Sequence, residues 1–356
     1  MKIWKTISIK IVAFLLVFVV LFLGVQQILR FKWGAHESMS EKMESCRTIE
    51  PGLDILYLGS SPLFAGISPI ILWKEQGITG INLGMSEQNV LCMYYLLLEV
   101  LDYQSPKLVV LDFYDFTTTR NVEANSRYES AYLKTMEVIS WPHKIDMIRE
   151  IMATNENQNP LNYAFPLLRY HTRWTELEKK DFVYQSSYRE YQKGAYQNKK
   201  VVSITPNQKY YPQDGLDENG EVEASDFAIY YYRKIVERCQ ERNIQVVALT
   251  LPNAYIPSVS KYERIQEFCD TYAIPYLNYN TDEGRVLVDI QFDEDLYDEG
   301  HLNIHGNIKM SRELAKQFHE QFGLEDHRED MAYASWNTDW NAFYKDFEEI
   351  LQQHGY

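Results

Sequence analysis

Cysteine is scarce in this chain, with four residues among 356. None of them forms a C-x-x-C pair or a spacing typical of a zinc site, and a fold built on disulfides would be smaller and richer in cysteine. The sequence therefore excludes a disulfide-built module and a zinc finger. We expect buried free thiols at Cys46, Cys92, Cys239 and Cys269.

Positive charge is also in deficit, because 35 Lys and Arg residues face 50 Asp and Glu residues and the formal net charge is −15. A protein that binds nucleic acid needs clustered Lys and Arg to displace counterions from the phosphates. The composition therefore argues against a nucleic-acid partner, and we attribute the acidic surface to solubility.

Several chemical motifs are missing. No G-x-S-x-G elbow of an ordinary α/β-hydrolase occurs around Ser61. The acidic run at residues 293–299 lacks the spacing and glycine of a calcium-binding EF-hand loop. His301 and His305 are four residues apart, but no third strong metal ligand accompanies them. We therefore expect neither a metal nor a cofactor.

One long hydrophobic run is present near the N-terminus. Residues 11–25 are all apolar or glycine, and the run continues to residue 29 past two glutamines. About 20 such residues cross a bilayer, whereas a cleaved signal peptide has an apolar region of about 7–15 residues and a small-x-small cleavage site. We favour an uncleaved membrane anchor at residues 1–30 over a signal peptide. We expect a single-pass protein of the cell membrane, with its N-terminus in the cytoplasm and its catalytic domain outside.

The rest of the chain alternates buried-strand patterns with amphipathic helices, which is typical of an α/β sheet. After a polar stem at residues 31–52, we predict a three-layer α/β/α domain at 53–325, with an insertion or lid at about 117–224 and an extension at 326–356. The insertion is rich in Tyr and Trp, which could belong to the core or form a platform for sugars. The expected strands are 54–58, 78–83, 107–113, 244–250 and 274–277. Two expected helices open at Ser68-Pro69 and at Ser86, where each serine is expected to cap the free N–H groups of the first turn. The other expected helices are 225–242, 261–272 and a last helix at 303–322.

A serine follows the first predicted strand directly, in the segment Leu58-Gly59-Ser60-Ser61. Open α/β sheets place their ligands at the carboxyl ends of the strands, which is where Ser61 would lie. A nucleophilic serine also needs a base, a group that orients the base, and donors for the oxyanion. An ordinary turn is the alternative interpretation of this segment.

A carboxylate and an imidazole precede the last predicted helix, as Asp298 and His301 in the segment Asp298-Glu299-Gly300-His301. A D-x-x-H turn can bring the carboxylate back to the ring, so that its second nitrogen faces the serine. A helix-capping turn with a surface histidine is the alternative.

These motifs together resemble those of the SGNH (GDSL-like) hydrolases. The pattern L-G-S-S, then N-L-G, then D-x-x-H-L-N-x-x-G is most similar to a membrane-anchored branch that includes DltD-like and alginate-O-acetylation-type proteins. The resemblance implies a flavodoxin-like sheet, with Ser61 as nucleophile and Asp298 and His301 completing a triad. It also implies that the N–H groups of Ser61 and Gly84 form the oxyanion hole.

One element departs from that family pattern. SGNH enzymes usually carry a G-x-N-D block after the third strand, whose asparagine donates to the oxyanion, and here Leu111-Asp112-Phe113-Tyr114-Asp115 stands in that place. An ionised carboxylate cannot donate and would repel the oxyanion. A third donor is therefore missing or comes from the insertion.

The resemblance implies an esterase or O-acyltransferase that transfers or removes acetyl or D-alanyl groups on an envelope glycopolymer. Its partners would be an envelope polysaccharide or teichoic acid, a membrane-bound O-acyltransferase, and the lipid bilayer through the N-terminal helix. Two alternatives stay open. One is a non-catalytic accessory protein with the same fold, and the other is a lipase or phospholipase.

Overall fold

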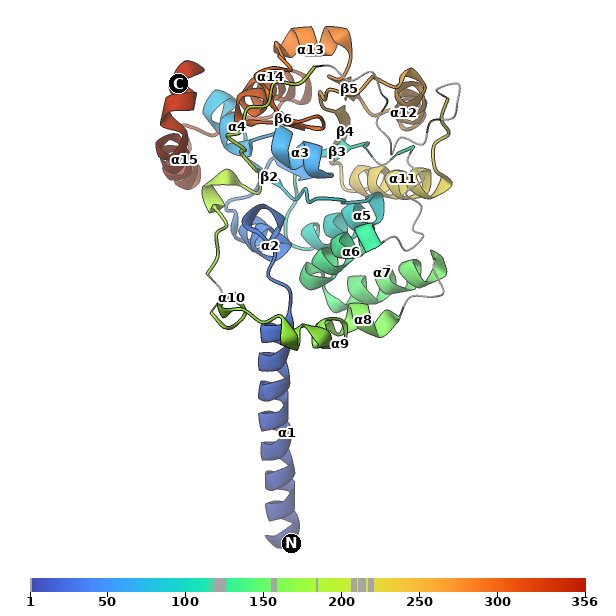
Figure 1. Cartoon of the computed structure of the whole chain (residues 1–356), viewed down its shortest axis with the longest axis vertical. Helices are drawn as coiled ribbons and strands as arrows, with labels where there is room; N and C mark the ends of the chain where they lie inside the picture. Colours follow the sequence, from blue (N-terminus) through green and yellow to red (C-terminus); the bar gives the residue numbers. More distant parts are fainter. Residues whose placement is uncertain are drawn as a thin grey trace.

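The computed structural model describes residues 2–114, 116–117, 126–154, 159–183, 185–205, 210, 216 and 221–356. Figure 1 shows a single helix, α1 (Lys2–Leu29), projecting from a compact body. The stretch Ile7–Leu29 is mostly apolar and mostly exposed, although Leu29 at its end is buried, and at about 1.5 Å per residue it is long enough to cross a bilayer. The predicted N-terminal apolar helix is confirmed.

The centre of the body is a five-stranded parallel sheet. Its strand order is β2-β1-β3-β4-β5, which is the flavodoxin-like order of doubly wound α/β folds. The sheet confirms the predicted fold class. Its strands are β1 (Ile55–Leu58), β2 (Gly80–Asn82), β3 (Leu108–Asp112), β4 (Gln245–Thr250) and β5 (Tyr276–Asn278).

Helices cover both faces of the sheet. Successive side chains of a strand point to opposite faces, so each strand contributes to two hydrophobic clusters. On β1, Leu56 and Leu58 belong to one hydrophobic cluster, and Ile55 and Tyr57 belong to the other. The first cluster includes residues of α5 (Val90–Val100), α11 (Asp226–Gln240) and α12 (Val259–Tyr272). The second includes residues of α4 (Pro69–Gln76), α13 (Asp282–Val288) and α14 (Ile304–Phe322).

Two predicted helix caps were wrong. Helix α5 begins at Val90 rather than after Ser86, and the Asn89 side chain caps it by accepting from the Cys92 N–H at 3.1 Å. Helix α4 does begin at Pro69, but the Ser68 hydroxyl does not cap it.

The predicted polar stem contributes to the core. Its helix α2 (Met39–Thr48) follows a short 3-10 turn (Ala35–Glu37) and buries Met39, Met43 and Cys46 completely. All four cysteines are free and buried, which confirms the prediction. Burial raises the pKa of the Cys46 thiol to about 12, so this thiol stays protonated.

The helix α14 is not the last helix, contrary to the prediction. After a 3-10 turn (Met331–Tyr333), α15 (Ala334–Gln353) packs against the body and buries Trp336, Phe343 and Leu351. Its Trp336 ring lies 5.6 Å from that of Trp73, so the C-terminal segment is part of the fold.

The predicted insertion is mainly helical where the structure describes it. Some of its aromatic side chains are buried, such as Tyr132 and Tyr163, and others are exposed, such as Trp141 and Trp174. Residues 118–125, 155–158, 184, 206–209, 211–215 and 217–220 of this stretch lie outside the described residues. Its elements are α6 (Ser126–Val138), α7 (Trp141–Thr154), α8 (Pro160–Ala164), α9 (Pro166–Tyr170), η2 (His171–Thr175), α10 (Lys179–Phe182) and η3 (Glu190–Gln192).

Candidate active site

Ser61 lies at the carboxyl edge of the sheet, where β1 turns directly into the short helix α3 (Ser61–Gly66). Gly59 makes this turn possible because the chain passes very close to β3. A Cβ atom at position 59 would lie 2.4 Å from the Asp112 Cβ and 2.7 Å from a Leu63 methyl carbon. The glycine therefore lets the first strand present its serine beside the third strand.

The Asp112 side chain, at the end of β3, accepts hydrogen bonds from the same turn. One of its carboxylate oxygens accepts from the Ser60 N–H at 3.0 Å and from the Ser60 hydroxyl at 2.7 Å. The other accepts from the Tyr114 N–H at 2.8 Å. The sequence analysis considered the carboxylates of the segment 111–115 only as groups that cannot donate to an oxyanion, and it missed this contact. In the structure the Asp112 carboxylate is buried and holds the residue next to Ser61.

Asp298 and His301 come from a small antiparallel hairpin formed by β6 (Leu296–Asp298) and β7 (His301–Leu302). Asn303 fixes this hairpin to the start of α14. Its side-chain oxygen accepts from the N–H groups of residues 305 and 306, and its nitrogen donates to the Leu296 carbonyl at 3.2 Å. The D-x-x-H segment is thus held against a long helix that packs on the sheet.

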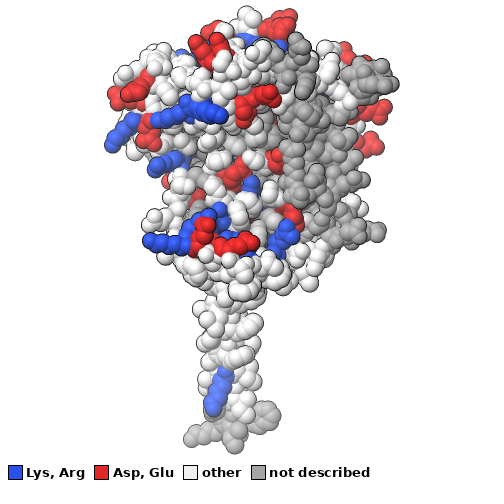
Figure 2. Space-filling view, in the orientation of Figure 1, with Lys and Arg blue, Asp and Glu red and all other residues white. Residues whose placement is uncertain are grey.

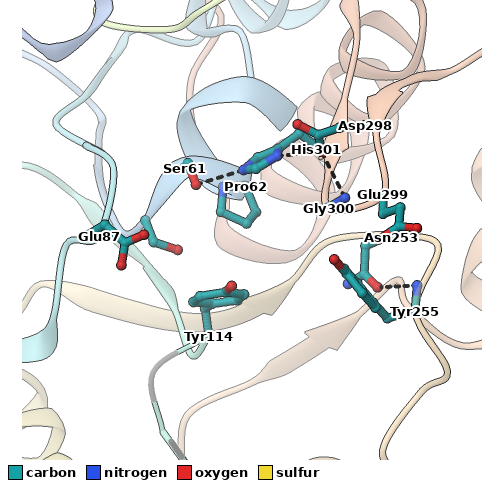
Figure 3. Close-up of a pocket in the computed structure, with 11 residues that line it drawn as sticks. Ser61, Pro62, Glu87, Tyr114, Asn253, Tyr255, Asp298, Glu299, Gly300 and His301 are labelled. Carbon is teal, nitrogen blue, oxygen red and sulfur yellow. Dashed lines mark hydrogen bonds and ion pairs between the residues drawn. The ribbon is translucent and has the colours of Figure 1, made fainter. Parts of the chain in front are cut away.

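The three predicted triad residues lie within hydrogen-bond distance of one another. His301 Nε2 is 2.7 Å from Ser61 Oγ, and His301 Nδ1 is 2.7 Å from Asp298 Oδ1 (Figure 3). With the Nδ1 proton directed at the carboxylate, the lone pair of the neutral ring is at Nε2 and faces the serine hydroxyl. This arrangement can transfer a proton from Ser61 to His301.

The surroundings of the triad fix the ring and keep the carboxylate charged. Tyr297 stacks on His301, with ring centroids 5.2 Å apart and an interplanar angle of 6°. Partial burial acts to raise the pKa of Asp298, but hydrogen bonds from His301 and from the Gly300 N–H outweigh it and lower that pKa below its usual value. Asp298 is therefore ionised at neutral pH and can stabilise a positive charge on the His301 ring.

Of the two predicted oxyanion donors, the Ser61 N–H remains available and the Gly84 N–H has an acceptor within the protein. The Ser61 N–H belongs to the first turn of α3, where helix N–H groups lack an intrahelical acceptor, and Pro62 contributes no N–H at all. The prediction for Gly84 is not supported, because its N–H donates to the Asn82 side-chain oxygen at 2.9 Å. Asn82 is fully buried and also donates to the Leu63 carbonyl, so it ties the loop after β2 to α3.

The triad opens into a cavity of about 410 Å³ at the carboxyl edge of the sheet (Figure 3). Asn253, from the loop after β4, lines this cavity. Its side-chain oxygen accepts from the Tyr255 N–H at 3.0 Å, and its amide nitrogen has no acceptor among the described residues. That NH₂ group can therefore donate to a substrate in the cavity.

Negative charge dominates the cavity. Three carboxylates line it, those of Glu87, Asp298 and Glu299, and no Lys or Arg does so among the described lining residues. Glu87 has a left-handed backbone with φ of 59°, which is uncommon for a residue with a side chain and is found more often at functional sites. Burial and then the Glu299 carboxylate raise the pKa of the Tyr255 phenol to about 12, so it remains a neutral hydroxyl.

Other groups of potential metal ligands have protein partners. His305 Nδ1 lies 3.0 Å from Nε2 of His354, a residue just after α15. Glu99, Asp102 and His143 form a group of suitable composition among the described residues. However, Arg47 binds the Glu99 carboxylate at 2.8 Å, and the Ser140 N–H binds it at 2.6 Å. These groups are therefore accounted for by structural contacts.

Comparison with known proteins gives limited information. No family model matches the chain, and no curated protein matches it. Among solved structures, a protein from Bacteroides fragilis proposed to be an acylhydrolase shares 12% identity and a TM-score of 0.38, over 80% of this chain and 95% of that one. A GDSL-like lipase from Bacteroides thetaiotaomicron has 13% sequence identity and a TM-score of 0.35, and the match covers 79% of this chain and 95% of that one. A catalytic mutant of an acetylxylan esterase from Geobacillus stearothermophilus has 11% sequence identity and a TM-score of 0.36, and the match covers 79% of this chain and 100% of that one. Similarities this low do not assign a function.

Proposed function

We propose that this chain is a membrane-anchored serine esterase or O-acyltransferase of the SGNH type. The observation that supports the proposal is the continuous hydrogen-bonded series from Ser61 Oγ through His301 to Asp298, with 2.7 Å at each step. A buried polar series can serve structure alone, but this one ends on a hydroxyl that lines a 410 Å³ cavity.

The reaction would follow from these positions. His301 Nε2 takes the Ser61 proton while Ser61 Oγ attacks the acyl carbonyl carbon of an ester. The Ser61 N–H binds the oxyanion, and the alcohol leaves with the proton from Nε2. Water or a hydroxyl of an acceptor then attacks the acyl carbonyl carbon and gives its proton to His301, which passes that proton to Ser61 Oγ as the acyl–serine bond breaks. Hydrolysis and acyl transfer differ only in this last nucleophile.

The charge of the cavity favours some substrates over others. Carboxylates at Glu87 and Glu299 repel a phosphodiester or a fatty-acid carboxylate and tolerate a neutral or cationic acyl group. Acetyl and D-alanyl esters meet this condition, whereas anionic phospholipids do not. We therefore prefer an esterase or O-acyltransferase to a phospholipase.

The substrate and partners follow from the location that we propose. With α1 as a single-pass anchor and the body outside the cytoplasm, the accessible acceptors are envelope polysaccharides or teichoic acids. The charge of the cavity favours a polysaccharide over the phosphodiester backbone of a teichoic acid. A membrane-bound O-acyltransferase beside α1 would supply the acyl group. This assignment depends on analogy with the anchored proteins that the motifs resemble.

A direct test is the hydrolysis of a small chromogenic acetyl ester by the full chain in detergent. We expect turnover above background that falls by about 10³-fold or more in Ser61→Ala and in His301→Ala, as for other triads. Addition of a soluble polysaccharide should partition the acyl group between water and polymer if the chain is a transferase.

The alternative is a non-catalytic accessory protein that binds a partner or polymer. One feature favours it, because Pro62 and the occupied Gly84 N–H leave the Ser61 N–H as the one backbone donor that we identify. If this alternative holds, Ser61→Ala should restore the cellular phenotype of a deletion strain as well as the unchanged chain does. The proposed function predicts that it will not.

A further inference from the structure

Exposed apolar side chains gather in one part of the body. Among the described residues beyond α1, more than half of the exposed large apolar side chains belong to residues 31 and 141–183. Trp174 is 71% exposed and Phe182 is 61% exposed. Leu161, Phe165 and Leu168 are also exposed. Large apolar side chains that gather on an exposed surface mark a contact with a protein or with a membrane.

These side chains are placed where α1 enters the body. Figure 1 shows α8, α9 and α10 at the base, next to the end of α1. Contacts join α1 to α9, α10 and η2. We call the segment of residues 160–183, which contains these elements, the collar.

Polar bonds hold the collar at the last turn of α1. Arg173 donates to the carbonyls of Leu29 and Arg30 at 2.6 and 2.9 Å, and it also binds Asp181 at 2.9 Å. The Leu167 N–H donates to the Gln26 side chain at 3.4 Å. The collar is therefore at the level of residues 26–30, where the apolar stretch of α1 ends.

That level corresponds to a membrane surface if α1 crosses a bilayer. Trp and other amphipathic aromatic residues are enriched at the headgroup level, and an apolar face there enters about 5–10 Å into the interface. Figure 2 shows a band of Lys, Arg, Asp and Glu on the body, with a rim of uncharged residues below it where α1 leaves. The collar itself carries exposed charges at residues 176 and 178–180, and these can stay at the headgroup level while the apolar side chains between them enter the interface.

We propose that the collar lies in the headgroup region of the bilayer, with the Trp174 and Phe182 side chains inserted. This proposal rests on α1 being a retained anchor, as proposed above. The occupant of the exposed surface is lipid, because the surface is fixed to the end of a membrane-length helix. The collar and α1 then hold the body in one orientation, so that the cavity stays at a constant height above the membrane.

Site-specific fluorescence quenching of the full chain in lipid nanodiscs tests this proposal. Single reporter cysteines would be introduced by Trp174→Cys and Phe182→Cys, and labelled with an environment-sensitive fluorophore. The four native cysteines are buried and should not react. Val286→Cys and Met331→Cys are matched controls, because these side chains are 80% and 82% exposed and lie outside the collar. Val17→Cys reports on α1.

The proposal predicts that nitroxide groups on shallow lipid positions quench the labels at 174 and 182 at least twofold more than the labels at 286 and 331. The label at 17 should be quenched by deep nitroxides. If the label at 17 is quenched but the labels at 174 and 182 are quenched no more than the controls, the proposal that the collar lies in the headgroup region is wrong and the anchor stands. Labels at 174 and 182 that react slowly only in native membranes, without lipid quenching, would indicate a protein partner and also overturn the proposal. An unquenched label at 17 would refute the anchor itself. Urea denaturation of each variant establishes that it folds.

Discussion

The exchange Asp112→Asn separates two roles for this residue that make opposite predictions. If Asp112 only replaces a missing oxyanion amide, asparagine should restore a donor, and such a donor is worth about 10²–10³ in rate in a serine protease. If Asp112 holds the nucleophile turn, as its contacts indicate, asparagine should be harmful. The structure predicts the second result.

The magnitude follows from the number of acceptor oxygens. The carboxylate accepts from the N–H groups of Ser60 and Tyr114 on different oxygens, at 3.0 and 2.8 Å. A carboxamide has one acceptor oxygen, so in either orientation its NH₂ group faces a backbone N–H. Leaving a buried donor unpaired costs about 1–3 kcal/mol. The Ser60 hydroxyl can rotate and accept from the new NH₂, so it adds little to this cost.

The assay combines urea denaturation with hydrolysis of the chromogenic acetyl ester. We expect Asp112→Asn to lose about 1–3 kcal/mol of stability. We also expect turnover to fall by about tenfold or more, because misplacement of a reacting group by about 1 Å can cost about 10²-fold. Ser60→Ala is the matched control, since it removes the hydroxyl contact and keeps the backbone one, and its effects should be smaller. An Asp112→Asn variant that is faster and equally stable would refute this reasoning.

Three further predictions concern Asn253 in the cavity, Gly59 in the turn and Lys42, which is fully buried on α2. Asn253→Asp keeps the acceptor for the Tyr255 N–H but removes the amide donor. We expect kcat/KM to fall by about tenfold with an unchanged urea midpoint, because one hydrogen bond to substrate is worth about 1.4 kcal/mol. An unchanged kcat/KM would exclude Asn253 from substrate binding. Gly59→Ala would place a methyl group 2.4 Å from the Asp112 Cβ. We expect urea denaturation to show a loss of about 1–3 kcal/mol of stability or more. A urea midpoint within error of the parent would show that the turn can relax. Burial lowers the pKa of Lys42 to about 7 from its ordinary 10.5, so the unfolded chain holds more protons between these values. Stability measured from pH 7 to 9 should therefore gain from this group as pH rises, and an equal slope in Lys42→Met would contradict the assignment.

The sheet could be predicted from the sequence because its strands are short, continuous apolar segments. Segments such as residues 107–113 and 244–250 match β3 and β4 to within one or two residues at each end. Side chains buried on both faces of a parallel sheet produce such segments directly. The start of α5 was misplaced because both Ser86 and Asn89 can cap a helix, and a capping preference alone cannot choose between them.

The triad could be predicted because its members lie beside strand ends and a helix start. The residues around the triad could not be predicted, because their positions depend on contacts between residues far apart in the sequence. The acceptor role of Asp112 toward Ser60 spans 52 positions, and nothing near either residue indicates it. The occupied Gly84 N–H has a local signal in Asn82, two residues earlier, whose side chain can bind back to the backbone. The helix α15 has Trp336, Trp340, Phe343 and Phe347 at helical spacing, so the sequence contained a signal that was overlooked.

Labelling of the full chain by a fluorophosphonate probe tests the central claim most directly, because the probe reacts with a serine that a base has activated. Ser61→Ala removes the nucleophile and His301→Ala removes the base, so each variant is a control for the other. If His301 activates Ser61, the unchanged chain is labelled at Ser61 and both variants lose that labelling. A folded chain that takes up no probe, or labelling that persists in His301→Ala at the parent rate, would contradict an activated serine at this site.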